Sequence, residues 1–413
     1  MVFFNIHKKL LVRKKIILLS YHYSHLIVQI IMSFIYFFIL FMVIVISILM
    51  IAYLGKRWLF WFNFHFTGYS KIIYWLFVVI AGLSLVFSRA LDGVFNKLSL
   101  IFNIIFAGFL CNIFILLIFD TIYLFSKKKL KPNLLLRIVY VNLVFSLFYC
   151  THEMAISPKT VYYQVKIDKP AHVENLRIVQ LSDIHINELT SSEFIQQMID
   201  KVNQLNADFI VITGDTLDKR LAPFIEQGFN KQFQQLKSKH GTYVIFGNHE
   251  YLNTRKQNNR EEDIIDAFKQ ANMKVLKDDI VYLDDIGITL IGRDDFSSAF
   301  YDVKRSKLAE LMMFADTNTP VILLDHQPKD LTEPAKLGVD LMISGHTHAG
   351  QIFPINLIEK LMYKNAYGLY QNEDNNFTSI VSSGYGFWGP PIRLMTRSEI
   401  VVIDVVFKKI HNK

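Results

Sequence analysis

Side chains of the kinds that bind metal ions follow a series of short apolar runs in the second half of this sequence. The first run ends in the string LSDIH, which places Asp183 and His185 two positions apart. In a β-strand successive side chains point to opposite faces, so we expect these two to point the same way. An Asp and a His near a strand end are more often a turn residue and a surface residue, so this pair alone does not define a site.

The same pattern recurs four more times along the chain. The later runs end in Gly214 and Asp215, in Gly247, Asn248, His249 and Glu250, in Asp325 and His326, and in Gly345, His346, Thr347 and His348. The carboxyl ends of the strands in an open α/β sheet share one edge, so all these side chains can converge there. Each string has an ordinary explanation as a turn or a surface polar residue, but their joint order favours one site.

The donors in these strings are carboxylates, imidazoles and one amide, a set that suits Mn²⁺, Fe or Zn²⁺. Both cysteines, Cys111 and Cys150, lie in the apolar first half, so no thiolate is available in the second half. Seven candidate ligands are too many for one ion. Two ions that share a bridging carboxylate would accommodate them and would activate a water for in-line attack on phosphorus.

The strings DIH, GD, GNHE, a lone His and GHTH, in this order, resemble the calcineurin-like metallophosphoesterase superfamily from Arg177 to Asp404. The longer strings SGHTHAGQI and GYGFWGPPIRL resemble more narrowly the bacterial membrane-associated branch with the YkuE-type and YaeI-type phosphoesterases. The resemblance implies an α/β fold that is a four-layer α/β/β/α sandwich. It also implies a catalytic centre with two divalent metal ions.

The resemblance assigns a role to each residue of these strings. The first metal ion would be held by Asp183, His185 and His348, Asp215 would bridge, and the second ion would be held by Asn248, His326 and His346. His249 would be the catalytic histidine, which is not a ligand but contacts the phosphate and protonates or stabilises the leaving oxygen.

Two positions depart from the pattern of this branch. Ala349 stands where Gly is usual, and we expect its methyl group to be tolerated. Arg293 stands where a small apolar residue is usual. It could bind a substrate phosphate, although a surface role is the simpler expectation.

Charge is distributed unevenly over the 413 residues. Residues 1–150 contain 15 of the 44 Lys and Arg residues but only two of the 36 acidic ones, Asp92 and Asp120, so the first part carries +13 and the rest −5. The net positive charge of the chain therefore comes from basic residues that flank the predicted membrane spans, and not from a nucleic-acid-binding surface. Nucleic acid is an unlikely partner for the acidic second half, which disfavours the alternative of a metal-dependent nuclease.

Long apolar stretches in the first part predict membrane spans and make the lipid bilayer the expected partner. We expect a transmembrane helical domain over residues 1–151 with about four spans, at 26–54, 72–88, 98–125 and 134–150. The third stretch is interrupted by Asn103, Asn112 and Asp120, and Asp120 could be functional or could lie at the interface. A membrane transporter or sensor with an attached regulatory phosphatase is the alternative that these polar residues leave open.

Basic residues flank the spans almost equally on both sides, so their totals do not decide the orientation by the positive-inside rule. The tightest cluster, at 127–131, directly follows a span, and we expect that loop to be cytoplasmic. The protein would then be a multi-pass protein of the bacterial cell membrane with an extracytoplasmic catalytic domain.

The second part, residues 157–413, alternates apolar runs with amphipathic stretches. We expect strands at 209–213, 243–246, 280–283, 288–291, 321–324, 339–343, 378–381 and 400–406. The first expected helix runs from 190 to about 205 and starts with a capping box of Thr190 and Glu193. A second helix is expected to end near 240, and two more are expected over 261–271 and 303–314. The whole pattern predicts a membrane-anchored hydrolase of a phosphodiester, phosphomonoester or pyrophosphate. The expected location beside the bilayer leaves a lipid-linked substrate open.

Overall fold

The computed structural model describes residues 37–408 except 39, 92–93, 258–259, 302 and 375, and for 253–257 the backbone alone. Contacts between Cα atoms divide the chain into two compact units. The first contains the described residues of Met1–Ser84 and Asn112–Tyr140, and the second those of Leu85–Cys111 and Val141–Lys413. This division differs from the expected one, a membrane domain over residues 1–151 and a catalytic domain over residues 157–413. The expected division stays a prediction.

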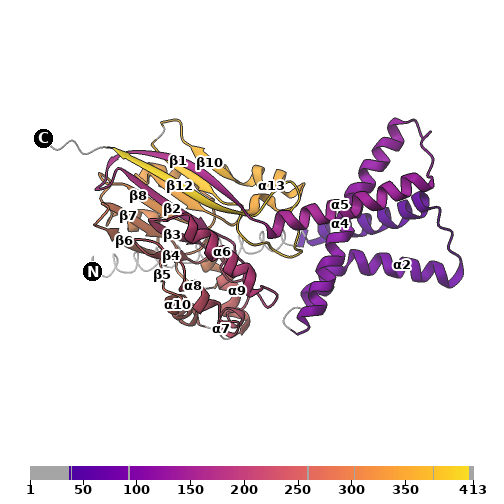
Figure 1. Ribbon diagram of the computed structural model, residues 1–413, viewed down its shortest axis with the longest axis horizontal. Coiled ribbons are helices and arrows are strands. Elements are labelled where there is room, and N and C mark those ends of the chain that lie inside the picture. Colours follow the sequence, from indigo (N-terminus) through magenta and orange to yellow (C-terminus); the bar gives the residue numbers. More distant parts are fainter. Residues whose placement is uncertain are drawn as a thin grey trace, which may run out of the picture. The chain divides into compact units, whose positions relative to one another are not determined.

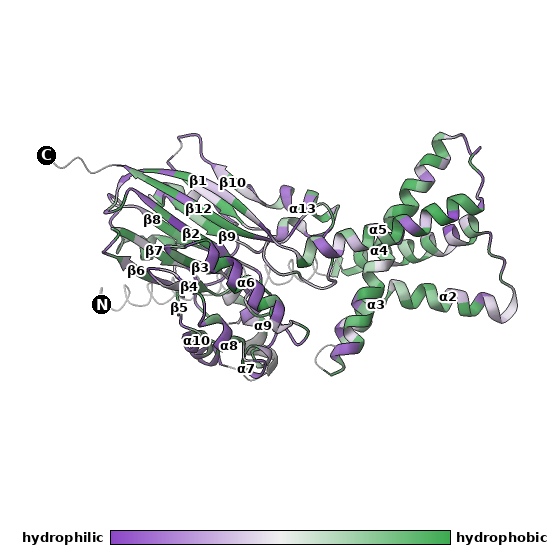
Figure 2. Ribbon diagram, in the orientation of Figure 1, coloured by the Kyte–Doolittle hydropathy of each residue, from purple (hydrophilic) through white to green (hydrophobic). Residues whose placement is uncertain are grey.

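Three helices are long and apolar enough to cross a membrane. They are Leu40–Phe62, α4 (Asn96–Phe125) and α5 (Leu134–Ile156), which are hydrophobic over most of their length (Figure 2). A fourth candidate is the pair α2 (Gly68–Gly82) and α3 (Ser84–Leu91), which bends by 59°. The described residues therefore hold three to four candidate spans. The break at Leu83 interrupts the stretch expected at 72–88, and the first part of the stretch expected at 26–54 lies outside the described residues.

Asp120 is held by three donors within the first unit. Its carboxylate accepts hydrogen bonds from Tyr53 Oη at 2.7 Å and Trp61 Nε1 at 2.8 Å, and it forms an ion pair with Arg57. A carboxylate in an apolar helix of a candidate span is costly unless it is paired, and here each donor offsets that cost. The geometry gives Asp120 a structural role in joining the helices that carry these side chains.

Two six-stranded sheets form the centre of the second unit (Figure 1). The first has the order β1-β12-β2-β3-β4-β5 and the second β10-β11-β9-β8-β7-β6. The strands of the first sheet are β1 (Lys159–Pro170), β2 (Asn175–Leu181), β3 (Phe209–Thr213), β4 (Thr242–Ile245), β5 (Met273–Val275) and β12 (Glu399–Lys408). Those of the second are β6 (Asp279–Leu283), β7 (Ile288–Gly292), β8 (Val321–Leu324), β9 (Leu341–Ser344), β10 (Gly368–Gln371) and β11 (Thr378–Val381).

Alternation along β3 shows how the sheets pack. Phe209 and Val211 point into the apolar core between the two sheets, whereas Ile210 and Ile212 point to the helices on the outer face. All four are fully buried, which explains why β3 reads as a continuous apolar run. The parallel register of β2, β3 and β4 places their carboxyl ends at one edge.

Helices cover the outer face of each sheet. The first sheet is covered by α6 (Ser192–Gln204), α8 (Phe229–Phe233) and α10 (Glu261–Gln270), next to α7 (Ala222–Glu226) and α9 (Asn248–Gln257). The second sheet is covered by α11 (Leu308–Met312) and α12 (Thr332–Leu337). The expected four-layer α/β/β/α sandwich is confirmed. Three short helices, η1 (Phe296–Tyr301), η2 (His348–Gly350) and α13 (Ile355–Met362), lie in connections.

Three local expectations were wrong. The helix expected to end near residue 240 is α8, which ends at Phe233. The N-cap of α6 is Ser191, whose hydroxyl accepts from the Phe194 amide, because the Thr190 hydroxyl is engaged by the amide of Asn187. The helix expected over 303–314 is only α11, since the preceding segment 303–307 is not helical.

Candidate metal centre

The site begins where the strands end, in a run of unusual backbone conformations. The strand β2 stops at Leu181, so Asp183 and His185 are not strand residues and the alternation argument does not explain their direction. Five residues of the expected metal set instead have left-handed backbone, namely Asp183 (φ 53°), His185 (φ 54°), Asp215 (φ 52°), His346 (φ 73°) and His348 (φ 50°). Each costs about 1–2 kcal/mol relative to right-handed backbone, and such strain concentrates at functional sites.

One cluster brings together Asp183, His185 and His348. His185 Nε2 lies 2.9 Å from His348 Nε2, and His348 Nε2 lies 3.4 Å from Asp183 Oδ1. All three residues are buried. Their ligand atoms lie within 4.8 Å of one another, the spacing of donors around a single ion.

A second cluster joins Asp215, Asn248, His326 and His346. Asn248 Oδ1 lies 2.9 Å from His346 Nδ1 and 3.3 Å from His326 Nε2, which itself lies 3.3 Å from Asp215 Oδ2. The backbone carbonyl of Thr213 accepts a hydrogen bond from His326 Nδ1 at 2.7 Å. That bond fixes the tautomer and leaves Nε2 of His326 as the atom that can bind a metal ion.

Asp215 connects the two clusters. Its Oδ2 lies 3.3 Å from His326 Nε2 of the second cluster and 3.9 Å from His185 Nε2 of the first. Its other oxygen, Oδ1, accepts from the His249 amide at 2.8 Å. A carboxylate between two donor groups is the position that a bridging ligand needs.

His249 lies at the edge of the first cluster and contacts Asp218. His249 Nδ1 lies 3.0 Å from Asp218 Oδ1 and also hydrogen-bonds to the carbonyl oxygen of Asp218. With Nδ1 engaged in this way, Nε2 is the nitrogen available to a substrate. The Asp218 carboxylate also lies 3.7 Å from His185 Nδ1.

The site glycines are explained by close approach. A Cβ atom at Gly214 would lie 2.6 Å from His326 Nδ1, and one at Gly247 would overlap the Asp215 carboxylate. No side chain fits at either position without displacing a member of the site. The glycines therefore allow the donor groups of neighbouring loops to meet.

Electrostatics keep three of the donors, those of Asp215, His346 and His348, in the form that binds metal ions. Burial lowers the pKa of His346 to about 3 and the pKa of His348 well below its usual range, so both are neutral. Burial acts to raise the pKa of Asp215, but His326 and His249 hold it well below its usual range. Burial also acts to lower the pKa of His249, yet the carboxylates of Asp215 and Asp218 raise it to about 9.

Buried nitrogen and oxygen donors in two linked clusters fit two divalent metal ions. The donor atoms of Asp183, His185 and His348, and those of Asp215, His326 and His346, each form a group of metal-binding size. A third group of that size combines His185 and Asp215 with His249. The chain thus suggests a dinuclear site of mixed carboxylate, imidazole and amide donors.

Comparison with known proteins places the sequence in a family. Residues 176–350 match the model of the calcineurin-like phosphoesterases. An uncharacterized metallophosphoesterase of Helicobacter pylori is 33% identical over 291 residues, 69% of this chain and 74% of that protein. An uncharacterized metallophosphoesterase of Campylobacter jejuni is 30% identical over 359 residues, 83% of this chain and 92% of that protein. This chain belongs to the calcineurin-like phosphoesterase family.

The family places the chain among metallophosphoesterases. The name of a further relative joins such a domain to a transmembrane protein. A Danio rerio protein named transmembrane protein with metallophosphoesterase domain is 31% identical over 260 residues, 61% of this chain and 58% of that protein. Membership of the YkuE-type and YaeI-type branch stays a prediction.

Glu250 positions the metallophosphoesterase site without being part of it. This fully buried carboxylate accepts hydrogen bonds from three backbone amides, those of Gly247 at 2.7 Å, Asp215 at 3.0 Å and Leu217 at 3.0 Å. It therefore ties the loop after β3 to the loop after β4. Sequence reasoning noted Glu250 in the string GNHE but gave it no role.

Arg393 is a second residue whose role was missed. Its guanidinium is fully buried and donates to the carbonyl oxygens of Ser383 at 2.6 Å, Gly386 at 2.7 Å and His348 at 3.2 Å. It joins the loop that carries His348 to the loop after β11. The string GYGFWGPPIRL contains this residue, so the signal was present but its contacts were not readable from sequence.

Arg293 is not a surface residue, and its phosphate-binding role stays a prediction. The side chain is buried, donates to the Ser306 carbonyl at 3.0 Å and lies 3.3 Å from Asp325 Oδ2. Asp325 also pairs with Arg305 at 2.6 Å. Arg293 therefore compensates a buried carboxylate next to His326, and the surface expectation was wrong because sequence does not show burial.

Proposed function

We propose that this chain hydrolyses a phosphate ester, as a diester, monoester or pyrophosphate, with two divalent metal ions. Asp183, His185 and His348 would hold the first ion, Asn248, His326 and His346 would hold the second, and Asp215 would be the ligand shared by both. The single observation that supports this most is the position of Asp215 between the two donor clusters, 3.3 Å from His326 and 3.9 Å from His185.

Bound Mn²⁺, Fe or Zn²⁺ ions would supply Lewis-acid stabilisation of the phosphoryl oxygens and a water activated for in-line attack. The reaction forms one bond between the water oxygen and phosphorus and breaks the bond between phosphorus and the leaving oxygen. His249 contacts the substrate phosphate through Nε2 and gives a proton to the leaving oxygen. Asp218 holds the ring of His249 in the orientation for that transfer.

The candidate spans make the enzyme a multi-pass membrane protein in this proposal, anchored in the bacterial cell membrane with its catalytic part outside the cytoplasm. The lysine cluster at 127–131 supports that orientation, because the loop after α4 would then be cytoplasmic. A reporter fusion after Cys150 tests it directly: activity of a periplasm-dependent reporter supports the orientation, and activity of a cytoplasm-dependent reporter contradicts it.

Hydrolysis of bis(p-nitrophenyl) phosphate by the full chain in nanodiscs with Mn²⁺ tests the enzymatic proposal. We expect turnover that a chelator abolishes and that added Mn²⁺ restores. The variant His249→Ala should keep its metal content and lose about 10²-fold or more in kcat. Exposed His172→Ala is the matched control and should keep the rate. Absence of turnover with metal ions bound would contradict the proposal.

A further inference from the structure

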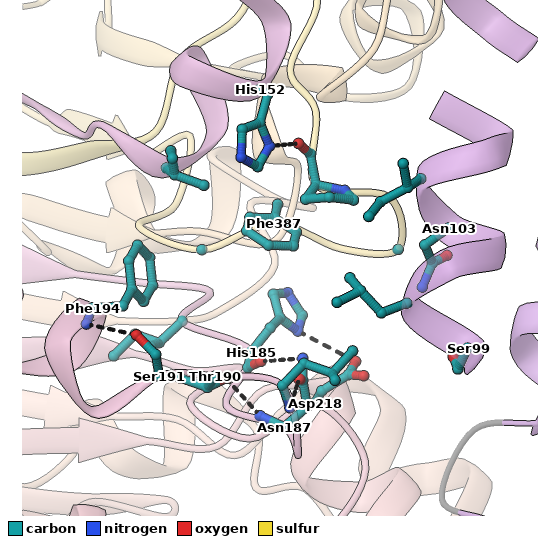
Figure 3. A pocket seen from close by; sticks show the side chains of 18 of the residues that line it. Ser99, Asn103, His152, His185, Asn187, Thr190, Ser191, Phe194, Asp218 and Phe387 are labelled. Atoms are coloured by element: carbon teal, nitrogen blue, oxygen red, sulfur yellow. Dashed lines mark hydrogen bonds and ion pairs between the residues drawn. The ribbon is translucent and has the colours of Figure 1, made fainter. Parts of the chain in front are cut away.

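A cavity of 560 Å³ in the second unit reaches the catalytic site. His185 and Asp218 line one part of it, and the opposite part is formed by the first turns of α4 and the last turns of α5 (Figure 3). Figure 3 shows Ser99 and Asn103 along α4 on the side of the cavity away from Phe194. This volume lies in the range of cavities that hold small-molecule ligands.

Apolar side chains line the part of the wall that α4, α5 and the loop after β11 form. They are Leu100 and Ile104 of α4, Phe148 and Ile156 of α5, and Phe387 of the loop after β11. A small water-soluble phosphate ester would leave these side chains in contact with water. An alkyl chain would cover them, and burial of apolar surface is favourable by about 25 cal/mol per Å².

The cavity also lies where two candidate spans meet the catalytic fold. The helix α4 begins at Asn96, α5 ends at Ile156 and the first strand begins at Lys159, so the wall uses the ends of both helices. The end of α5 is fixed to this fold by hydrogen bonds from the Arg393 amide to the Thr151 carbonyl at 2.8 Å and from the Ser398 amide to the Met154 carbonyl at 3.0 Å. A molecule held in a bilayer beside these helices would approach the site at the helix ends that line the cavity.

Away from His185 and Asp218, two buried polar atoms of the wall have no hydrogen-bond partner among the described residues. They are Arg89 Nη2 and Asn103 Oδ1. The Arg89 guanidinium lies 4.8 Å from the ring centre of Trp388, so its position is fixed by stacking while this nitrogen stays available. A buried polar atom without a partner is costly, and a polar headgroup would satisfy both atoms.

We infer that the substrate is an amphiphile: a phosphate ester that carries a long alkyl chain. Its phosphate lies at the metal centre, its chain lies between α4, α5 and Phe387, and its polar groups contact Arg89 and Asn103. The inference rests on the proposed function for the position of the phosphate. It adds the substrate class and assigns the ends of two membrane helices to substrate recognition.

A tryptophan that fills the cavity tests this assignment. Leu100→Trp places an indole in the apolar wall, and Ile101→Trp is the matched control, because Ile101 is the next residue of α4, is exposed and does not line the cavity. Both variants and the wild-type full chain in nanodiscs are assayed with Mn²⁺ on p-nitrophenyl phosphodiesters that carry methyl, octyl or hexadecyl groups.

For the wild type we expect kcat/KM to rise at least tenfold from methyl to hexadecyl. Leu100→Trp should remove that rise, while Ile101→Trp should behave as the wild type. A rate that does not depend on chain length, or an equal loss for all three esters in Leu100→Trp, would overturn the inference.

A binding measurement separates this inference from the proposed function. A hexadecyl phosphate with a photoactivatable diazirine in its chain should crosslink to the tryptic peptides of α4 and α5 in the wild type and in Ile101→Trp, but not in Leu100→Trp. Crosslinking without any hydrolysis would retain the amphiphile site and reject the proposed reaction. Hydrolysis of the methyl ester without crosslinking would retain the reaction and reject the amphiphile.

Discussion

The carboxylate of Asp218 lies beside His249, the proposed catalytic histidine, with Oδ1 3.0 Å from His249 Nδ1. Asp218→Asn removes the charge that orients and stabilises the protonated imidazole. We expect kcat to fall by about 10- to 100-fold with little change in KM, the range for partners that orient active-site groups. Kinetics on bis(p-nitrophenyl) phosphate measure this, with Asp200→Asn on the exposed face of α6 as control. Equal losses in both variants, or loss of bound metal ions, would contradict a positioning role.

The Gly247 position tests whether close backbone approach assembles the site. In Gly247→Ala the new methyl group overlaps the Asp215 carboxylate, so we expect this carboxylate to move and metal affinity to fall by about 10-fold or more. Gly228→Ala is a control, because a Cβ there meets no atom within 4 Å although its φ is also positive. Competition with a fluorescent chelator gives both affinities. Unchanged affinity in Gly247→Ala would show that Asp215 does not need its present position.

Ala349 has left-handed backbone, with φ 52° and ψ 28°, next to His348. Its methyl group was expected to be tolerated, but a left-handed backbone carries a conformational energy cost in any residue other than glycine. Ala349→Gly removes about 1–2 kcal/mol of strain against an entropic cost of about 0.5–1 kcal/mol, so the variant should be more stable by up to about 1.5 kcal/mol. Thermal unfolding of the full chain measures this. Ala335→Gly in α12 should destabilise, and a lower Tm for Ala349→Gly would be the contrary result.

Asp294 should make stability depend on pH. Burial raises its pKa to about 6, although Tyr251 Oη donates to both of its oxygens. The pKa in the folded state is above the ordinary value, so the stabilising contribution is complete below about pH 4 and is lost as pH rises through 6. Between pH 4 and 7 we expect the wild type to lose about 2–3 kcal/mol relative to Asp294→Asn. Urea titrations of both proteins at several pH values measure the difference, and parallel pH profiles would contradict it.

Two kinds of feature could be predicted from the sequence. They are strands that are buried on both faces, and metal-binding side chains that directly follow such strands. The strands Phe209–Thr213 and Val321–Leu324 were expected at their observed bounds because continuous apolar runs mark them. The expected donors also meet, because the loops that carry them follow neighbouring parallel strands.

Features that depend on contacts distant in sequence could not be predicted. Edge strand Lys159–Pro170 mixes exposed and buried residues, so its apolar pattern is weak until Glu399–Lys408 pairs with it. The roles of Glu250 and Arg393 depend on backbone groups of other loops, which no spacing reveals. The direction of Asp183 and His185 was predicted from strand alternation, whereas left-handed backbone sets it.

The dinuclear centre is tested most directly by the metal content of the wild type and of Asp215→Ala, by inductively coupled plasma mass spectrometry on the full chain loaded with Mn²⁺. Because Asp215 stands between the two clusters, we expect about two ions per chain in the wild type and at most one in the variant. A wild type that binds no ion at these residues, or a variant that keeps both ions, would contradict a dinuclear centre bridged by Asp215.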